Sequence, residues 1–348
     1  ICKQIEKYKP NIFIISNPII FKKVKNKFKN KKVKIFQNFE SIKSIKKNDI
    51  TIAAISGIAG LNPTLRMIKH SKNLLIANKE AIICGWNLIK RKCQKNNTKI
   101  IPVDSEHFSI SQLLMSHSLN EIKKIYLTAS GGPFLNYNFK KLKNVRPKDA
   151  LQHPRWKMGK KISVDSATLM NKMLELIEAQ KLFNIPNKQL DIIIHPQSLV
   201  HAIVELNNGL VKFIYHETSM IIPLVNAIFE GNLNINDFYK RKGKSKKNID
   251  DLSFKKVNVK TFPVIQIKDR INEYPSTSII VNACNEILVD HFLQKKIPFL
   301  SIIKLIKTIL NDRNYTKYAI KRPKNINQIH EIDIWAKKII LKKIKKRI

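Results

Sequence analysis

The chain has 348 residues, of which 43% are hydrophobic, and its 65 Lys+Arg against 25 Asp+Glu give a formal net charge of +40. The hydrophobic share excludes a disordered polybasic tail, because such a tail cannot bury enough apolar surface to offset its chain entropy. No run approaches the roughly 18 apolar residues of a membrane span, and four cysteines without a CxxC pair favour a reducing, cytoplasmic setting.

The first 103 residues alternate between strand-like and helix-like segments. Apolar, β-branched runs predict strands at 11–16, 33–36, 50–55, 74–77 and 100–103, and helical spacing predicts helices at 17–29, 61–70 and 79–93. This alternation predicts an α/β fold whose parallel sheet is covered on both faces. A dinucleotide-binding sheet opens with a GxGxxG-type turn, and the nearest stretch is Ser-Gly-Ile-Ala-Gly at 56–60. Either this domain binds no dinucleotide, or the sequence lacks its true N-terminus.

The character of the chain changes at Asp104. Residues 104–230 hold several compact polar clusters, and residues 231–261 are polar and lysine-rich, which predicts a linker. Helical periodicity returns at 277–293, 298–310 and 329–346. We therefore expect an α+β domain over 104–230 and a C-terminal helical domain over 262–348.

A pair of carboxylates, Asp104 and Glu106, follows the predicted strand at 100–103. On an extended chain, residues two apart point to one face, so both side chains would converge. Paired carboxylates suit a hard divalent cation such as Mg²⁺ or Mn²⁺. The alternative is that both are solvated loop acids.

A glycine turn, Ser130-Gly131-Gly132-Pro133-Phe134, follows the strand-like residues 125–128. Two glycines permit close backbone approach to a ligand, and their N–H groups could hold an anion. An ordinary turn explains the same pattern.

The densest polar segment spans residues 153–178. Ser163 or Asp165 is a candidate N-cap for a helix beginning near Ser166, and that helix N-terminus would favour a phosphate. Asn171, Lys172 and Glu175 would share one helix face, with Glu175 available as a third carboxylate. The alternative is a surface ion pair between Lys172 and Glu175, with Trp156 and Met158 in the core.

A further cluster, His195-Pro196-Gln197-Ser198-Leu199-Val200-His201, suggests a nucleophile at Ser198. We reject that interpretation, because no GxSxG elbow is present and the pattern places no orienting acid. A structural or substrate-shaping role is favoured.

Taken together and in order, these clusters resemble 1-deoxy-D-xylulose 5-phosphate reductoisomerase. The matching stretches are GIAGLNPTL (57–65), LLIANKEAI (74–82), PVDSEH (102–107), LTASGGPF (127–134), HPRWKMGKKISVDSATLMNK (153–172), IHPQSLVHAIVE (194–205) and NACNEI (282–287). The resemblance implies an NADPH- and divalent-metal-dependent (Mg, Mn or Co) rearrangement and reduction of 1-deoxy-D-xylulose 5-phosphate to 2-C-methyl-D-erythritol 4-phosphate, in isoprenoid precursor synthesis. It also implies a homodimer with a phosphorylated-sugar substrate, without a specific nucleic-acid or membrane partner.

The resemblance also supplies roles for individual residues. It implies that the metal ligands are Asp104, Glu106 and Glu175, and that the catalytic residues are Lys79, Glu106, His153 and Glu175. The substrate-binding residues would be Lys79, Ser105, Glu106, Ser130, His153, Trp156, Ser166, Asn171, Lys172 and Glu175. NADPH would touch Asn78, Glu80 and Gly159, and Trp156 and Met158 would lie in a mobile lid that closes over the substrate.

One family feature is absent from the sequence. The N-terminal strand, glycine turn and helix that hold the NADPH pyrophosphate are missing, so residues 1–103 would form an incomplete Rossmann-like domain. We expect residues 1–348 alone to bind NADPH poorly and to have little activity, as either a truncated or a decayed copy, although the native full-length chain would be an active enzyme. Robust turnover by residues 1–348 alone would contradict this.

The charge has two interpretations, a nucleic-acid-binding surface or lysine drift in an AT-biased genome. Residues 104–230 carry 15 Lys+Arg and 11 Asp+Glu, whereas the rest of the chain carries 50 and 14. The excess therefore lies outside the segment with the site motifs, which favours surface drift.

Overall fold

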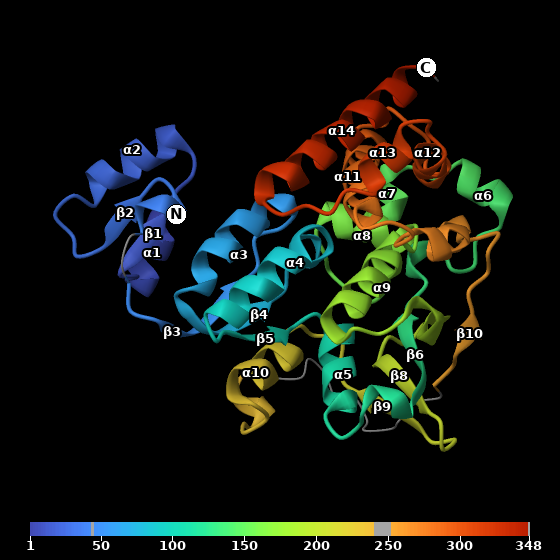
Figure 1. The fold of residues 1–348 in the computed structure, drawn as a ribbon, viewed down its shortest axis with the longest axis horizontal. Coiled ribbons are helices and arrows are strands. Elements are labelled where there is room, and N and C mark those ends of the chain that lie inside the picture. The colour runs from blue at the N-terminus through green and yellow to red at the C-terminus, as the bar shows by residue number, and fades with distance from the viewer. Residues whose placement is uncertain (43–44, 240–251, 347–348) are drawn as a thin grey trace.

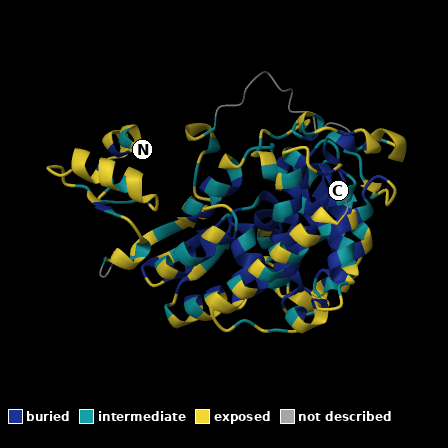
Figure 2. Ribbon diagram, turned by 90° about the horizontal axis from the view of Figure 1, so that it is seen from above, coloured by how far each residue is buried: buried dark blue, intermediate teal, exposed yellow. Residues whose placement is uncertain are grey.

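The computed structural model describes residues 1–42, 45–239 and 252–346 (Figure 1). The N-terminal unit holds a two-stranded parallel sheet, β1–β2, and lies beside the rest of the molecule with its own small core around Ile15, Val24 and Phe28. Figure 2 shows that most of this unit is exposed. Its elements are α1 (Cys2–Tyr8), β1 (Ile12–Ile14), α2 (Pro18–Lys27) and β2 (Lys34–Phe36).

A second parallel sheet, β3-β4-β5, carries the polar loops that lead into the site. Leu74 and Ile76 of β4 belong to the core shared with α3 and α4, whereas Leu75 packs with Ala227 of α10 on the other face. The prediction of a covered parallel sheet is correct here, but among the described residues the strands β1 to β5 form two parallel sheets and not one. The elements are β3 (Asn48–Ala53), α3 (Leu61–Ile68), β4 (Ser71–Ile76), α4 (Lys79–Lys95), β5 (Lys99–Pro102) and α10 (Ile221–Phe229).

A mixed five-stranded sheet, in the order β10-β7-β6-β8-β9, supports the other side of the site. β6 pairs with β7 in parallel, and the remaining pairs are antiparallel. The strand β10 lies inside the predicted linker, whose residues 240–251 fall outside the described part of the chain. The strands are β6 (Ile122–Ala129), β7 (Leu190–Ile194), β8 (Val200–Leu206), β9 (Val211–Tyr215) and β10 (Lys255–Lys256).

The helices between these strands correct one prediction. A helix was expected to begin near Ser166, but α8 spans Lys160–Ala167 and α9 spans Met170–Phe183. Leu169 adopts a left-handed conformation (φ 64°), which interrupts the helix between the two. Ser166 therefore lies in the last turn of α8, and the predicted helix N-terminus for a phosphate is wrong. The other helices here are α5 (Ser105–Leu114), α6 (Phe139–Lys143) and α7 (Pro147–Ala150).

The C-terminal segment is helical, as predicted. Its central helix, α11 (Thr277–Leu293), is buried along most of its length and contacts α4, α8 and α14. One hydrophobic core runs from Ala53 to Ile344, so the C-terminal helices and the central segment stabilise one another. No helix in the described part of the chain is long and apolar enough to cross a membrane. The remaining helices are α12 (Ser301–Leu310), α13 (Tyr315–Ala319) and α14 (Ile326–Lys345).

Candidate active site

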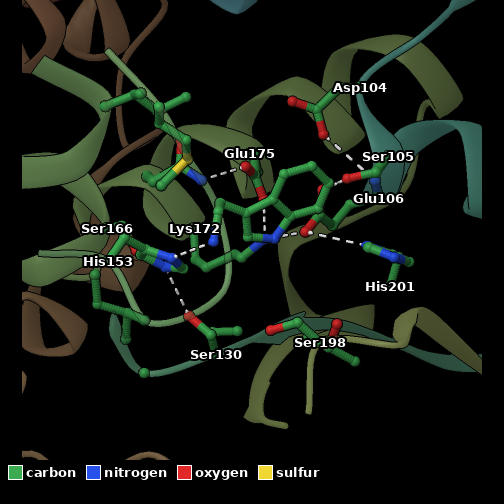
Figure 3. A pocket seen from close by; sticks show the side chains of 18 of the residues that line it. Asp104, Ser105, Glu106, Ser130, His153, Ser166, Lys172, Glu175, Ser198 and His201 are labelled. Atoms are coloured by element: carbon green, nitrogen blue, oxygen red, sulfur yellow. Dashed lines mark hydrogen bonds and ion pairs between the residues drawn. The ribbon is translucent and has the colours of Figure 1, made fainter. Parts of the chain in front are cut away.

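The first two carboxylates lie at the start of α5. Asp104 is the N-cap of this helix, and its Oδ1 accepts a hydrogen bond from the Glu106 backbone N–H at 3.3 Å. The extended geometry predicted for this pair is therefore wrong, because residues from Ser105 onward are helical. The first helical turn nevertheless brings both carboxylates to the same point (Figure 3).

Glu175 of α9 completes a group of three acids. Oxygen atoms of Asp104, Glu106 and Glu175 lie within 4.8 Å of one another, and Glu175 is only 1% exposed. The interpretation of the first two as solvated loop acids is thereby excluded. Three carboxylates around one point form the donor set that Mg²⁺ or Mn²⁺ prefers, so these residues fit a divalent cation.

Two buried ammonium groups balance the three acids. Nζ of Lys79 lies 2.8 Å from Oε1 of Glu175 and 3.1 Å from Oδ2 of Asp104. Burial opposes the charge of Lys79, but these carboxylates outweigh it and hold its pKa well above the usual range. Lys172 pairs with Glu106 and, at 2.7 Å, with Oε2 of Glu175.

The same balance sets the charge on Glu106. Burial alone would raise the pKa of Glu106, but the Lys172 ammonium holds it well below the usual range. Burial likewise opposes the charge of Lys172, whereas Glu106 and Glu175 raise its pKa to about 12. Glu106 and Lys172 are therefore both charged at neutral pH.

One face of α9 carries Asn171, Lys172 and Glu175, as their spacing predicts. Lys172 and Glu175 are buried, which excludes the alternative of a surface ion pair. Asn171 Nδ2 donates to Glu175 Oε1, and Asn171 Oδ1 accepts from Lys79 Nζ at 3.0 Å. The Asn171 amide thus fixes the position of both charged groups.

A second group of polar side chains faces the acids across the pocket. His153 Nδ1 accepts backbone N–H groups from Arg155 and Trp156, so Nε2 carries the proton and donates to Ser130 Oγ at 3.0 Å. Burial, with a smaller effect of the Lys172 charge, lowers the pKa of His153 to about 4. His153 is therefore a neutral hydrogen-bond donor at pH 7.

Backbone conformation and close packing explain the two glycines of this turn. A Cβ on Gly132 would press against the backbone of Ser166 and Ala167, and Gly131 adopts φ 82°. The close backbone approach predicted toward a ligand is here an approach to α8. That contact holds Ser130 and Ser166 on the same wall of the pocket.

Two lid candidates, Trp156 and Met158, are only partly buried and line the same pocket. The Trp156 ring meets the His201 ring edge-on, with centroids 6.2 Å apart. The alternative of two core residues is therefore wrong for both.

All predicted metal, catalytic and substrate residues line one pocket. They are Lys79, Asp104, Ser105, Glu106, Ser130, His153, Trp156, Ser166, Asn171, Lys172 and Glu175.

Three further residues line the pocket without an expected ligand role: Ser198, His201 and Met220. His201 Nδ1 lies 3.9 Å from Oε1 of Glu106, and Ser198 has a left-handed backbone (φ 57°) that turns it into the pocket (Figure 3). The motif at 195–201 contains Ser198 and His201, so it was the sequence feature that could have identified them as pocket residues. Nothing in the sequence pattern points to Met220.

The predicted NADPH residues lie outside this pocket. Asn78 donates to the carbonyls of Ile55 and Gly57, and its Oδ1 caps α4 at Ala81. Its amide therefore fixes the loop after β3. The Glu80 carboxylate pairs with Lys161 at 3.1 Å, and Gly159, the N-cap of α8, has open space around its Cα.

Comparison with known proteins gives a consistent result. The family model described as 1-deoxy-D-xylulose 5-phosphate reductoisomerase matches residues 1–85, and two models of its C-terminal domains match residues 100–183 and 217–339. Proteins of that name from Pelagibacter ubique and Wolbachia pipientis wMel are 45% and 39% identical. The aligned regions cover 95% of this chain in both cases, and 86% and 85% of the relatives.

Solved structures of the same family are also similar to this chain. A DOX-P reductoisomerase in complex with NADPH, fosmidomycin and magnesium has a TM-score of 0.84 at 29% identity, covering 99% of this chain and 88% of that one. The Zymomonas mobilis enzyme in complex with NADPH has a TM-score of 0.83 at 30% identity, covering 98% and 88%.

Proposed function

Because the chain belongs to the 1-deoxy-D-xylulose 5-phosphate reductoisomerase family, we propose that the pocket around Asp104, Glu106 and Glu175 is its active site. The reaction is the NADPH- and divalent-metal-dependent rearrangement and reduction of 1-deoxy-D-xylulose 5-phosphate to 2-C-methyl-D-erythritol 4-phosphate. The observation that carries the assignment is the convergence of three carboxylates from α5 and α9 within 4.8 Å.

The three carboxylates are the proposed metal ligands. Their all-oxygen donor set suits Mg²⁺, Mn²⁺ or Co²⁺, and a related structure contains magnesium. When bound, the cation supplies Lewis-acid polarisation of substrate oxygens. Lys79 and Lys172 hold the carboxylates in place through ion pairs, so that little reorganisation is needed on binding.

We propose that two groups of lining residues bind different parts of the substrate, one its hydroxyl groups and the other its phosphate. Lys79, Ser105 and Glu106 are proposed to bind its hydroxyl groups. Its phosphate is proposed to be bound by Ser130, His153, Ser166, Asn171 and Lys172. Support comes from Lys172, a buried cation, and from His153, whose neutral ring donates from Nε2.

Trp156 and Met158 are proposed to form the lid over this substrate. Their partial burial at the pocket wall supports a segment that closes on binding and excludes water from the reaction.

NADPH is proposed to lie beside the carboxyl ends of β3 and β4, where open α/β sheets bind ligands. Asn78 shapes the loop after β3, whereas Glu80 offers a carboxylate held by Lys161. Gly159 has open space around its Cα, which supports close approach of the cofactor to the start of α8.

Three wider assignments belong to the same proposal. Val211, Phe213 and Tyr215 alternate on the exposed face of the edge strand β9, which supports pairing with a second copy as a homodimer. Four free cysteines support a reducing, cytoplasmic setting. The division at residues 103, 230 and 261 into NADPH-binding domain, catalytic domain, linker and helical domain is supported at its first boundary by the family matches at 1–85 and 100–183.

The activity assay follows NADPH consumption and product formation by mass spectrometry. Product, even in a small amount, is expected only when 1-deoxy-D-xylulose 5-phosphate, NADPH and Mn²⁺ are all present, and a chelator should abolish its formation. Product formation that persists in the chelator would contradict the proposal.

A further inference from the structure

Behind the three acids lies a second buried group, His107 of α5 and Glu178 of α9. Both residues are 0% exposed, and Glu178 lies one helical turn after Glu175. The His107 ring stacks on Phe183, with centroids 6.3 Å apart. Neither carboxylate oxygen of Glu178 has a hydrogen-bond partner among the described residues. A buried carboxylate is costly unless charge partners offset its desolvation, so its presence needs a reason.

His107 contacts two of the proposed metal ligands. Its Nε2 lies 3.0 Å from the backbone oxygen of Glu175, and because a carbonyl only accepts, Nε2 is the donor. Its Nδ1 lies 3.4 Å from Oδ1 of Asp104. One imidazole ring therefore spans α5 and α9 at the positions from which the first and third carboxylates project.

Glu178 closes this arrangement from the other side. Its Oε2 lies 3.4 Å from the same Nδ1 atom, so the ring nitrogen is flanked by two carboxylates. Burial raises the pKa of Glu178 to about 8; burial opposes the charge of His107, but Glu178 and Asp104 raise its pKa to about 9. These shifts agree with the geometry, in which Nδ1 faces acceptors on both sides.

We propose that Glu178 is a positioning residue for the metal site. Its carboxylate fixes the orientation of the His107 ring, and the ring in turn fixes the Asp104 carboxylate and the Glu175 backbone. The inference rests on the proposed function, since it concerns the same three carboxylates. Residues that orient metal ligands in this way affect affinity without touching the metal.

A double-mutant cycle on Mn²⁺ affinity tests this, with free Mn²⁺ measured by electron paramagnetic resonance. The variants are Glu178→Gln, His107→Gln and the double variant; glutamine at 107 keeps a donor near Nε2 and removes Nδ1. We expect Glu178→Gln to weaken binding on the order of tenfold. The double variant should bind no more weakly than His107→Gln alone, because Glu178 acts through His107.

Two controls separate positioning from general damage. Asp333→Asn removes another buried carboxylate, on α14 and paired with Lys337, and should leave Mn²⁺ affinity unchanged. Glu178→Asp keeps the carboxyl group with a shorter reach, so its affinity should lie between those of the parent and Glu178→Gln, and this variant serves if Glu178→Gln fails to fold.

The outcomes are distinguishable. Unchanged affinity in Glu178→Gln, or additive losses in the double variant, would overturn the inference while leaving the metal site intact. Two Mn²⁺ ions per chain, one of them lost in Glu178→Gln, would overturn it by making Glu178 a ligand; Asp104, His107 and Glu178 also place donor atoms within 4.8 Å of one another. Parent binding that is absent, or unaffected by Glu175→Gln, would overturn the metal site and the inference together.

Discussion

Nζ of Lys79 lies 2.8 Å from Oε1 of Glu175, and this contact joins the first residue of α4 to the middle of α9. Both side chains are buried, so each charge depends on the other for compensation. The loop after β4, which approaches the proposed cofactor region, is thereby tied to the proposed metal ligands. The charge of Lys79 therefore acts on the proposed metal ligands from a position beside the proposed cofactor region.

Lys79→Met should destabilise the metal-free protein by about 3 kcal/mol, because it leaves buried carboxylates uncompensated. Added Mn²⁺ should stabilise this variant more than the parent, since the cation replaces the missing positive charge. Urea unfolding with and without Mn²⁺ measures both effects. Lys72→Met, which removes an exposed pair with Asp49, is the control and should change little. Equal losses in the two variants would contradict the prediction.

Gly60→Ala should destabilise the fold by roughly 1–3 kcal/mol through overpacking. A Cβ at Gly60 would overlap the Asn78 amide and the Ile55 carbonyl, which are hydrogen-bonded to each other. Gly159→Ala is the matched control, since its Cβ would meet nothing within 4 Å and its φ is −65°. Thermal unfolding of both variants checks this, and a stable Gly60→Ala protein would contradict the packing argument.

Acid should destabilise the fold through His216. Burial and the neighbouring His201, stacked at 3.9 Å, lower the pKa of His216 from about 6.5 to about 4. The unfolded chain therefore takes up a proton before the native one, so stability present above pH 6.5 is lost as the pH falls toward 4.

His216→Phe removes this titration. The slope of unfolding free energy against pH should become shallower by about 1.4 kcal/mol per pH unit in that window. Urea titrations at several pH values measure the slope, and an unchanged slope would refute the assignment.

Phe213→Lys should convert the proposed homodimer to a monomer. Phe213 is 47% exposed and lies between Val211 and Tyr215 on the outer face of β9, where a charge would disrupt an apolar contact. Sedimentation velocity gives the mass of each species. Phe139→Lys changes an equally exposed ring on α6 and should remain dimeric. A monomeric parent would contradict the proposed interface.

Periodic segments of the fold were predictable from sequence, because local pattern determines them. The helix expected at 277–293 coincides with α11, and β1 to β5 lie within a few residues of their predicted positions. The start of α9 was mispredicted, since the sequence does not reveal that Leu169 is left-handed and separates α9 from α8. The division of β1 to β5 into two sheets depends on pairing between distant residues, which periodicity does not encode.

The site was predictable in its parts but not in its assembly. Asp104 and Glu175 are far apart in sequence, and spacing alone left each with an ordinary surface interpretation; the family resemblance brought them together. Glu178 looks like any helical acid, and only the packing of α9 against α5 buries it. The same holds for Met220, which reaches the pocket from the start of α10.

The central claim is that Glu175, with Asp104 and Glu106, holds the cation on which the reaction depends. The most direct measurement compares Mn²⁺-dependent formation of 2-C-methyl-D-erythritol 4-phosphate by the parent, Glu175→Gln and Glu286→Gln, the last of which changes a surface acid paired with Lys337. The account predicts that the parent and Glu286→Gln form product at the same rate, whereas Glu175→Gln forms none. Product formation by Glu175→Gln at the parent's rate would contradict it.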